Sequence, residues 1–265
     1  IHAELMRGVR GGRLQPGELR TSQNWIGPAG CTLNTATFVP PPHHAVSAAL
    51  GDLENFLHAS DDLSPLVKIA LAHVQFETIH PFLDGNGRVG RLLITFLLTE
   101  RGVLHKPVLY LSHYFKRHRQ TYYEHLQAVR GEGAWEAWLA FFLRGVIEVA
   151  GEAAEMARRI LQLREQHRAA ITAQLGRAAR NGHKVLESLF DRPIVAVNDV
   201  QKMTGTTYAA ANSLVSRLVK LGVLGEMTGY ARNRRFRYAP YIALFNEAGP
   251  GGGAAEAPSR AHEDV

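Results

Sequence analysis

The chain has 265 residues, of which 46% are hydrophobic and 20% charged, a composition typical of a globular protein with one large domain or two unequal ones. No run approaches the roughly 18 apolar residues that a membrane-spanning helix needs. Cys31 is the only cysteine, which excludes an internal disulfide and argues against a cysteine-based zinc site. We therefore expect a reducing compartment, by default the cytoplasm.

Positive charge is concentrated late in the chain. The formal net charge is +6, and residues 183–245 carry nine Lys and Arg against four Asp and Glu. An excess of this size indicates a nucleic acid, an acidic partner or simply a solvated surface.

The first 145 residues predict a mainly helical domain. A Gly-, Pro- and Thr-rich stretch holds two short β-prone runs within residues 24–39, which predict a hairpin. After the prolines at 40–42, apolar residues recur at helical spacing. Helices are expected at about 46–57, 64–79, 87–101, 116–130 and 134–151, and the last one leads into a helical connector at 146–182.

A smaller α+β domain is predicted at residues 183–245, where three short helices and two strands follow one another in the order of a winged helix. We expect these elements at about 183–190, 197–203, 208–221, 223–228 and 235–239. Asn198 is expected to cap the second helix. Residues 246–265, rich in Gly and Ala, predict a disordered tail.

The most informative segment is residues 80–91, His-Pro-Phe-Leu-Asp-Gly-Asn-Gly-Arg-Val-Gly-Arg. Gly85 and Gly87 allow the backbone to approach a ligand closely and to adopt positive φ. A helix that starts at Gly87 directs its free N–H groups and its positive dipole end at the loop. The segment therefore predicts an anion-binding loop.

The charged residues of this loop indicate a polyphosphate. Arg88 and Arg91 are three apart on the first helical turn, so both can reach one anion. Asp84 lies beside them, and one carboxylate next to bound phosphates is a common way to hold Mg²⁺. His80, across the turn, is the natural general base.

Residues 80–91 resemble the signature of the Fic family, His-x-Phe-x-Asp/Glu-Gly-Asn-Gly-Arg-x-x-Arg, with every specified position filled. The approach helix at 72–79 and a flap within 20–41 also fit, so the resemblance covers about residues 1–150. It implies a mainly α fold, in which a Fic helical core with a β-hairpin flap occupies residues 1–145 and a winged-helix domain follows the connector.

The resemblance implies a protein adenylyltransferase, which transfers AMP from ATP to a Ser, Thr or Tyr hydroxyl of a target protein and releases pyrophosphate. It makes His80 the catalytic base and Asp84 the Mg²⁺ ligand. Tyr122 is placed near the adenine, as is Arg130, where relatives often carry Asn. ATP and its phosphates are assigned to Gly85, Asn86, Gly87, Arg88, Val89, Gly90 and Arg91.

The flap can have a role in the reaction, because a strand edge can hold a segment of the target protein by main-chain pairing and so bring the target's hydroxyl to the base. Its docking residues are expected to be Trp25, Ile26, Gly27, Phe38 and Val39. The partners implied are an unidentified target protein and the chain itself through self-modification. A homodimer stays open, and no membrane is involved.

Three other functions stay open beside the transferase. The protein is a transcription regulator if its helical domain senses a nucleotide without turning it over and its winged helix binds DNA through the arginines at 232, 234, 235 and 237. A protein-interaction or dimerisation module fits the same winged-helix pattern. A reversed reaction would make it a de-AMPylase. A Doc-like phosphotransferase is the least favoured of these functions, since those relatives carry Ala and Lys where this chain has Gly85 and Gly87.

Many family members are restrained by a helix with Ser/Thr-x-x-x-Glu-Gly/Asn, whose Glu pairs with the second arginine of the loop. Neither Glu54-Asn55 nor Glu132-Gly133 has Ser or Thr at the required position. Because the chain begins with Ile1 rather than Met, we expect an internal fragment whose inhibitory helix lies upstream.

Overall fold

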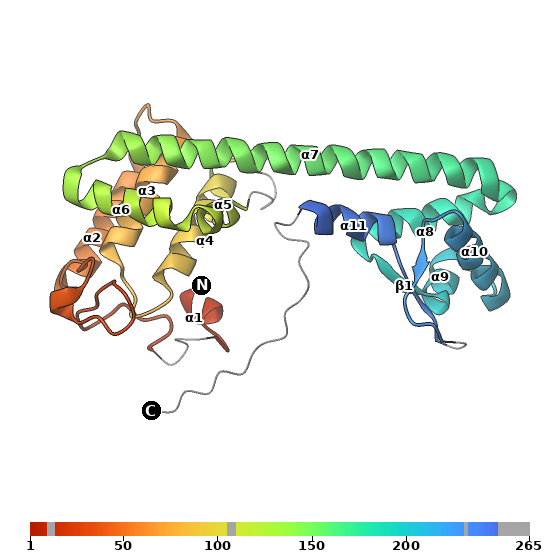
Figure 1. Ribbon diagram of the computed structural model, residues 1–265, viewed down its shortest axis with the longest axis horizontal. Helices are drawn as coiled ribbons and strands as arrows, with labels where there is room; N and C mark the ends of the chain where they lie inside the picture. The colour runs from red at the N-terminus through yellow and green to blue at the C-terminus, as the bar shows by residue number, and fades with distance from the viewer. Residues whose placement is uncertain (10–13, 105–109, 231–232, 249–265) are drawn as a thin grey trace. The chain divides into compact units, whose positions relative to one another are not determined.

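The computed structural model describes residues 1–9, 14–104, 110–230 and 233–248, and the chain divides into two compact units, 1–153 and 154–265 (Figure 1). None of the helices in these described ranges is both long and apolar enough to span a bilayer. The elements of the first unit are α1 (His2–Leu5), η1 (Leu33–Thr35), η2 (His43–Ala45), α2 (Val46–His58), α3 (Pro65–Ile79), α4 (Asn86–Glu100), α5 (Leu111–Arg117), α6 (Arg119–Glu132) and the first part of α7 (Trp135–Leu175).

Helix α3 is the central helix of the first unit. Pro65 stands at its first position, where a missing N–H costs nothing. The helix packs against α2, α4 and α6 (Figure 1). Nine of its fifteen residues are buried, which is the pattern of a core helix rather than a surface one. The indole of Trp138 on α7 is fully buried and donates to the carbonyl of Ala70 at 3.0 Å.

The mainly α fold and the flap are confirmed, with two differences in detail. The hairpin is reduced to one bridge between Ile26 and Phe38, because the intervening residues turn through a 3-10 helix instead of pairing. The helix expected at 116–130 is two helices, α5 and α6, which meet at His118, whose φ of −107° and ψ of 40° interrupt the helical path.

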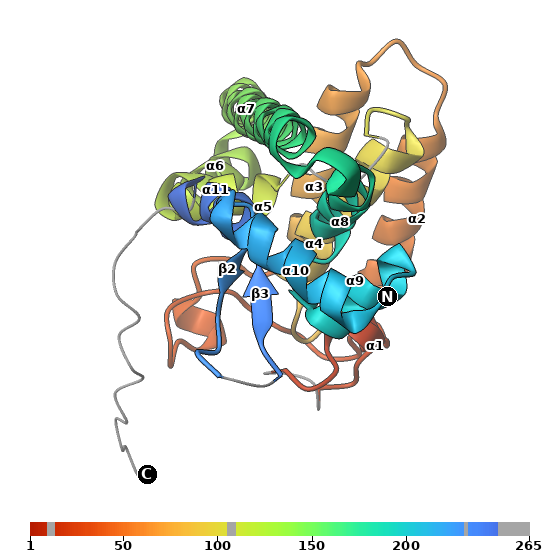
Figure 2. The ribbon, with the colours of Figure 1, turned by 90° about the vertical axis from the view of Figure 1, so that its right-hand side faces the viewer.

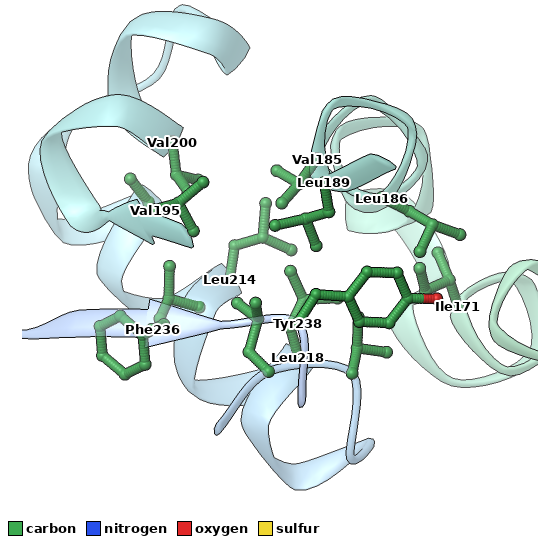
Figure 3. Packing of buried hydrophobic residues seen from close by; sticks show 14 of the residues in the cluster. Ile171, Val185, Leu186, Leu189, Val195, Val200, Leu214, Leu218, Phe236 and Tyr238 are labelled. Atoms are coloured by element: carbon green, nitrogen blue, oxygen red, sulfur yellow. The ribbon is translucent and has the colours of Figure 1, made fainter. Parts of the chain in front are cut away.

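The second unit packs helices against a small antiparallel sheet in the order β1-β3-β2. Ile194 pairs with Arg237, and Gly225 pairs with the same residue from the other side. Side chains from α7, α8, α10 and the sheet converge on one core (Figure 3). The elements are the rest of α7, η3 (Gly176–Ala178), α8 (Ala179–Asp191), β1 (Ile194–Ala196), α9 (Val197–Thr204), α10 (Tyr208–Lys220), β2 (Gly225–Glu226), β3 (Arg235–Arg237) and α11 (Ala239–Ala248).

Several details of this unit differ from expectation. The cap of α9 is Ala196, whose N–H donates to the Asp199 carboxylate at 2.8 Å, so Asn198 lies inside the first turn. Strand β1 and helix α11 were not expected from the sequence. Helix α11 includes residues 246–248, which we had placed in the tail, and residues 249–265 lie outside the described ranges.

Two glycines on α7 provide a matched test of packing in the first unit. A Cβ at Gly145 would lie 2.5 Å from the ring of Tyr114, whereas a Cβ at Gly151 meets nothing within 4 Å. We expect Gly145→Ala to lower the free energy of unfolding by about 1–3 kcal/mol through overpacking. Gly151→Ala should raise it by up to about 1 kcal/mol through helix propensity.

Urea titration followed by tryptophan fluorescence measures this unit selectively, because Trp25, Trp135 and Trp138 all lie within it. A stabilising effect of both substitutions would contradict the packing described for α5 against α7.

Candidate active site

The site begins where α3 ends. His80 follows the last residue of the helix in the left-handed conformation, with φ of 49° and ψ of 61°, and its N–H still donates to the carbonyl of Phe76. This conformation costs a non-glycine residue about 1–3 kcal/mol and persists only where its surroundings fix it. The turn directs the chain from α3 into the loop that leads to α4.

Arg20 provides the fixing contacts for this turn. Its side chain is 2% exposed, and its guanidinium donates to the carbonyls of His80 at 2.9 Å and Ile79 at 3.3 Å. The same group reaches the carbonyls of Ser22 and Pro41 at the base of the flap. A buried guanidinium thus satisfies the last carbonyls of α3, complements the negative end of the helix dipole and joins the flap to the turn.

The loop itself is closed by two asparagines. Asn86 is 2% exposed and brackets the backbone of Phe82, accepting from its N–H at 2.8 Å and donating to its carbonyl at 2.7 Å. Asn24 of the flap donates to the same carbonyl at 2.9 Å. The Asn86 side chain therefore shapes the loop, and only its backbone N–H, in the first turn of α4, is suited to a phosphate.

Gly85 caps the start of α4 and has the left-handed conformation, with φ of 83°. A Cβ there would lie 2.6 Å from the sulfur of Met6 and 3.1 Å from His2. The His2 ring stacks on Phe82 with centroids 3.9 Å apart, and its Nε2 bonds the carbonyl of Asp84 at 2.9 Å. The N-terminal segment therefore packs against one side of the loop and fixes its shape.

The two arginines of the loop occupy different surroundings. Arg88 is partly exposed and lies 3.7 Å from the carboxylate of Asp84. Arg91 lines a cavity of about 410 Å³ together with Lys116, Arg119 and Tyr123. Val89, between them, packs its side chain against the core beneath α4, so only its backbone can face a ligand.

A buried carboxylate lies beneath the loop. A Cβ at Gly90 would clash with Oε1 of Glu77, which is buried and has no hydrogen-bond partner among the described residues. Burial raises the pKa of Glu77 to about 7, although Arg91 and Arg130 favour its charged form. Gly90 is thus required by the close approach of α3 to α4.

The imidazole of His80 is set up as a neutral base. Burial lowers its pKa to about 4, and the charges of Arg130 and Arg20 act in the same direction. Its Nδ1 lies 3.3 Å from the carbonyl of Glu77, an acceptor, so Nδ1 carries the proton and Nε2 is the free lone pair. At neutral pH the ring can accept a proton without first losing one.

The two residues expected near the adenine both make hydrogen bonds within the protein. Tyr122 is 3% exposed and its hydroxyl donates to Nε2 of His73 at 2.9 Å, and the residue also lines the cavity beside Arg91. Arg130 donates to the carbonyl of Glu77 at 2.8 Å and stacks over the ring of Phe38 at 3.9 Å. Arg130 therefore ties the flap to the end of α3.

The remaining flap residues present an accessible edge. Trp25 and Val39 are exposed, and the Trp25 indole donates to the carbonyl of Cys31 at 3.0 Å. The backbone at Gly27 approaches Cys31 so closely that a Cβ there would lie 2.6 Å from the sulfur. Ile26 and Phe38 supply the bridge that holds this edge beside the turn at His80.

The donor set at the loop fits a magnesium ion shared with a phosphate ligand. Asp84 offers one partly exposed carboxylate, whose Oδ1 accepts from the N–H of Gly85. Within the described ranges no group of three or more His, Cys, Asp or Glu side chains is placed to bind a metal. One hard oxygen ligand suits Mg²⁺ that takes its other ligands from phosphates and water, and does not suit a metal held by protein alone.

The site residues predicted from the sequence include His80 and the loop but not Arg20, Asn24 and Glu77. Glu77 and His80 share a helical face in the sequence pattern, which was a usable signal. Arg20 and Asn24 lie about sixty residues along the sequence from the backbone groups that they bind, so no local sequence pattern predicts these contacts.

The Fic/DOC family model matches residues 1–98. A probable protein adenylyltransferase of Aquifex aeolicus (strain VF5) is 42% identical over 69 residues, which are 26% of this chain and 22% of that protein. The protein adenylyltransferase Fic of Aedes aegypti is 34% identical over 130 residues, 48% of this chain and 23% of that protein. The chain thus spans about a quarter of the curated relatives that it matches.

A crystal structure of a Fic family protein from Desulfovibrio desulfuricans G20 aligns with 89% of this chain and 66% of that one, with a TM-score of 0.53. The sequence identity is 21%, so this likeness establishes the fold.

Replacing Arg20 tests whether its guanidinium fixes the turn. We expect Arg20→Lys to lower the free energy of unfolding of the first unit by about 2–4 kcal/mol, because an ammonium cannot reach all four carbonyls and leaves some of them buried and unpaired. Arg7→Lys, at an exposed position, should change it by less than about 0.5 kcal/mol. Equal stability of the two variants in urea titrations would refute the role given to Arg20.

Proposed function

We propose, from the premise that residues 1–98 form a Fic/DOC family domain, that this protein transfers AMP from ATP to a hydroxyl side chain of a protein. One observation carries the proposal, namely a neutral His80 with a free Nε2 beside a glycine-rich loop that begins a helix bearing two arginines. The names of the relatives support the same reaction.

The loop provides the phosphate site. The N–H groups of residues 86 and 87 and the positive end of α4 would bind the α-phosphate oxygens, where charge builds in the transition state, because the N–H of Gly85 already donates to Asp84. Arg88 and Arg91 would hold the β- and γ-phosphates and orient the α-phosphate for in-line attack. Asp84 would hold Mg²⁺, which when bound would neutralise phosphate charge.

The chemical step needs one proton acceptor. The target hydroxyl gives its proton to Nε2 of His80 while its oxygen forms a bond to the α-phosphorus. The bond from that phosphorus to the bridging oxygen of the β-phosphate breaks, and pyrophosphate leaves with the electron pair. Because His80 is neutral before the step, no prior deprotonation is required.

The flap would hold a segment of the target protein beside His80. Its edge beside the Ile26–Phe38 bridge is accessible, and main-chain pairing there would hold an extended segment in register with His80. Arg20 and Arg130 would keep the flap at a constant distance from the base, since each contacts both the flap and the end of α3.

Labelled ATP tests the proposal. We expect label from [α-³²P]ATP with Mg²⁺ to appear on the chain itself or on added proteins, and no label from [γ-³²P]ATP. His80→Ala should slow labelling by about 10²–10⁴-fold, the usual contribution of a general base. His44→Ala, at an exposed position outside the site, should label at the normal rate.

Label from the γ-phosphate would instead show a phosphotransferase. Undiminished α-label in the His80→Ala protein, or no label on any acceptor, would contradict the proposed function.

A further inference from the structure

The second unit carries a polar cavity that the proposed reaction does not use. The cavity has a volume of about 560 Å³ and lies among the start of α9, the start of α10 and the segment that enters β3. Its polar lining is Asn198, Tyr208, Asn212, Asn233, Arg234 and Arg235. We call the surface formed by this cavity, the outer side of α10 and the outer side of β3 the arginine face.

Helix α10, which follows α9 after a short turn, lies at the centre of the arginine face. Helix α9 ends at Thr204 and is followed by Gly205 in the left-handed conformation. Helix α10 begins at Tyr208, and its cap is Thr207, whose hydroxyl accepts from the N–H of Ala210. Helix α10 has 13 residues, about 20 Å of length. This is the arrangement of a helix-turn-helix, in which the second helix is free on one side.

The free side of α10 is lined by small residues. Leu214 and Leu218 face the core, whereas the exposed positions are Ala209, Ala210, Ser213 and Ser216, with Tyr208 at the start and Lys220 at the end. Small side chains let a helix approach the floor of a groove closely. One aromatic residue at the helix start suits a groove better than a stacking platform for unpaired bases, which needs several.

Basic residues outnumber acidic residues in the stretch that forms this surface. Residues 194–238 contain seven Lys and Arg against two acids, Asp199 and Glu226. Asp199 caps α9 and Glu226 lies 3.9 Å from Arg234, so both carboxylates already have partners within the protein. A polyanion would therefore meet little repulsion here.

The strand β3 directs two arginines outward. Strands β2 and β3 lie side by side (Figure 2). Phe236 is buried in the core, so its neighbours Arg235 and Arg237 lie on the opposite, exposed side of β3. Arg234 is held in place, because its guanidinium donates to the side-chain oxygen of Asn212 at 2.7 Å. This bond links the strand to α10 and sets the spacing between the helix and the outward arginines.

We propose that the arginine face binds duplex DNA, with α10 in the major groove and with Arg235 and Arg237 on backbone phosphates. Helix length, small side chains and the flanking cations each match a groove between two phosphate rows. Tyr208 and Asn212 lie at the end of α10 that enters the groove first, where base edges are read. The proposal is independent of the adenylyl transfer.

Fluorescence anisotropy of the full chain with a labelled duplex of about 24 base pairs tests it, since two helical turns exceed the footprint of one such helix. We expect Arg235→Gln/Arg237→Gln to weaken binding about 10- to 100-fold at low salt. The slope of log Kd against log salt, from about 50 to 200 mM, should fall by about 1.8 for two lost phosphate contacts.

The double variant Arg177→Gln/Arg180→Gln is the matched control, because it removes the same charge from exposed positions of the same unit outside the cavity. It should bind within about twofold of the unmodified chain if the arginine face is the site. Circular dichroism checks that both variants fold.

An equal loss in both double variants would overturn the proposal, as would no duplex binding at low salt. Competition by the single strand or by poly-L-glutamate as strong as that by the duplex would also overturn it, and would indicate a single-strand or acidic-protein surface. Labelling from [α-³²P]ATP should be unchanged in both variants, which separates this test from that of the proposed function.

Discussion

The buried guanidinium of Arg20 is the contact on which the site depends. The left-handed turn at His80 is unfavourable for a residue with a side chain, and α3 ends there with carbonyls that have no partner in the helix. Arg20 binds those carbonyls and, through the same group, the carbonyls of Ser22 and Pro41. Burying the charge costs free energy, and four acceptors offset that cost. Base, loop and flap consequently share one anchor.

Burial around this anchor also determines the charge of the neighbouring titratable side chains. Glu77 and His80 lie next to each other in a region where burial disfavours charge, and burial shifts their pKa values in opposite directions, to about 7 and about 4. The imidazole is therefore neutral, while the loop in front of it remains strongly positive through Arg88, Arg91 and the start of α4. The positive loop is thus suited to bind a phosphate, while the neutral imidazole a few residues away is suited to accept a proton.

The features of the fold and of the site that depend on residues close together in the sequence could be predicted. The loop, the helices and the flap follow from patterns within about a dozen residues, where glycine, proline and apolar spacing act directly. The resemblance places Tyr122 near the adenine, and Tyr122 lines the same cavity as Arg91, but the bond from its hydroxyl to His73 spans 49 residues and no local pattern predicts it. Strand β1 has only three residues and pairs with a strand about forty residues later, so its own sequence could not reveal it.

The most direct test of the central claim is the protonation state of His80, measured by long-range ¹H–¹⁵N NMR on the full chain, with His80→Gln to assign the signals. The account predicts a neutral ring with the proton on Nδ1 from pH 8 down to about 5.5, because burial holds the pKa near 4 rather than the ordinary value of about 6.5. A ring that becomes an imidazolium near pH 6.5, or that carries its proton on Nε2, would contradict it.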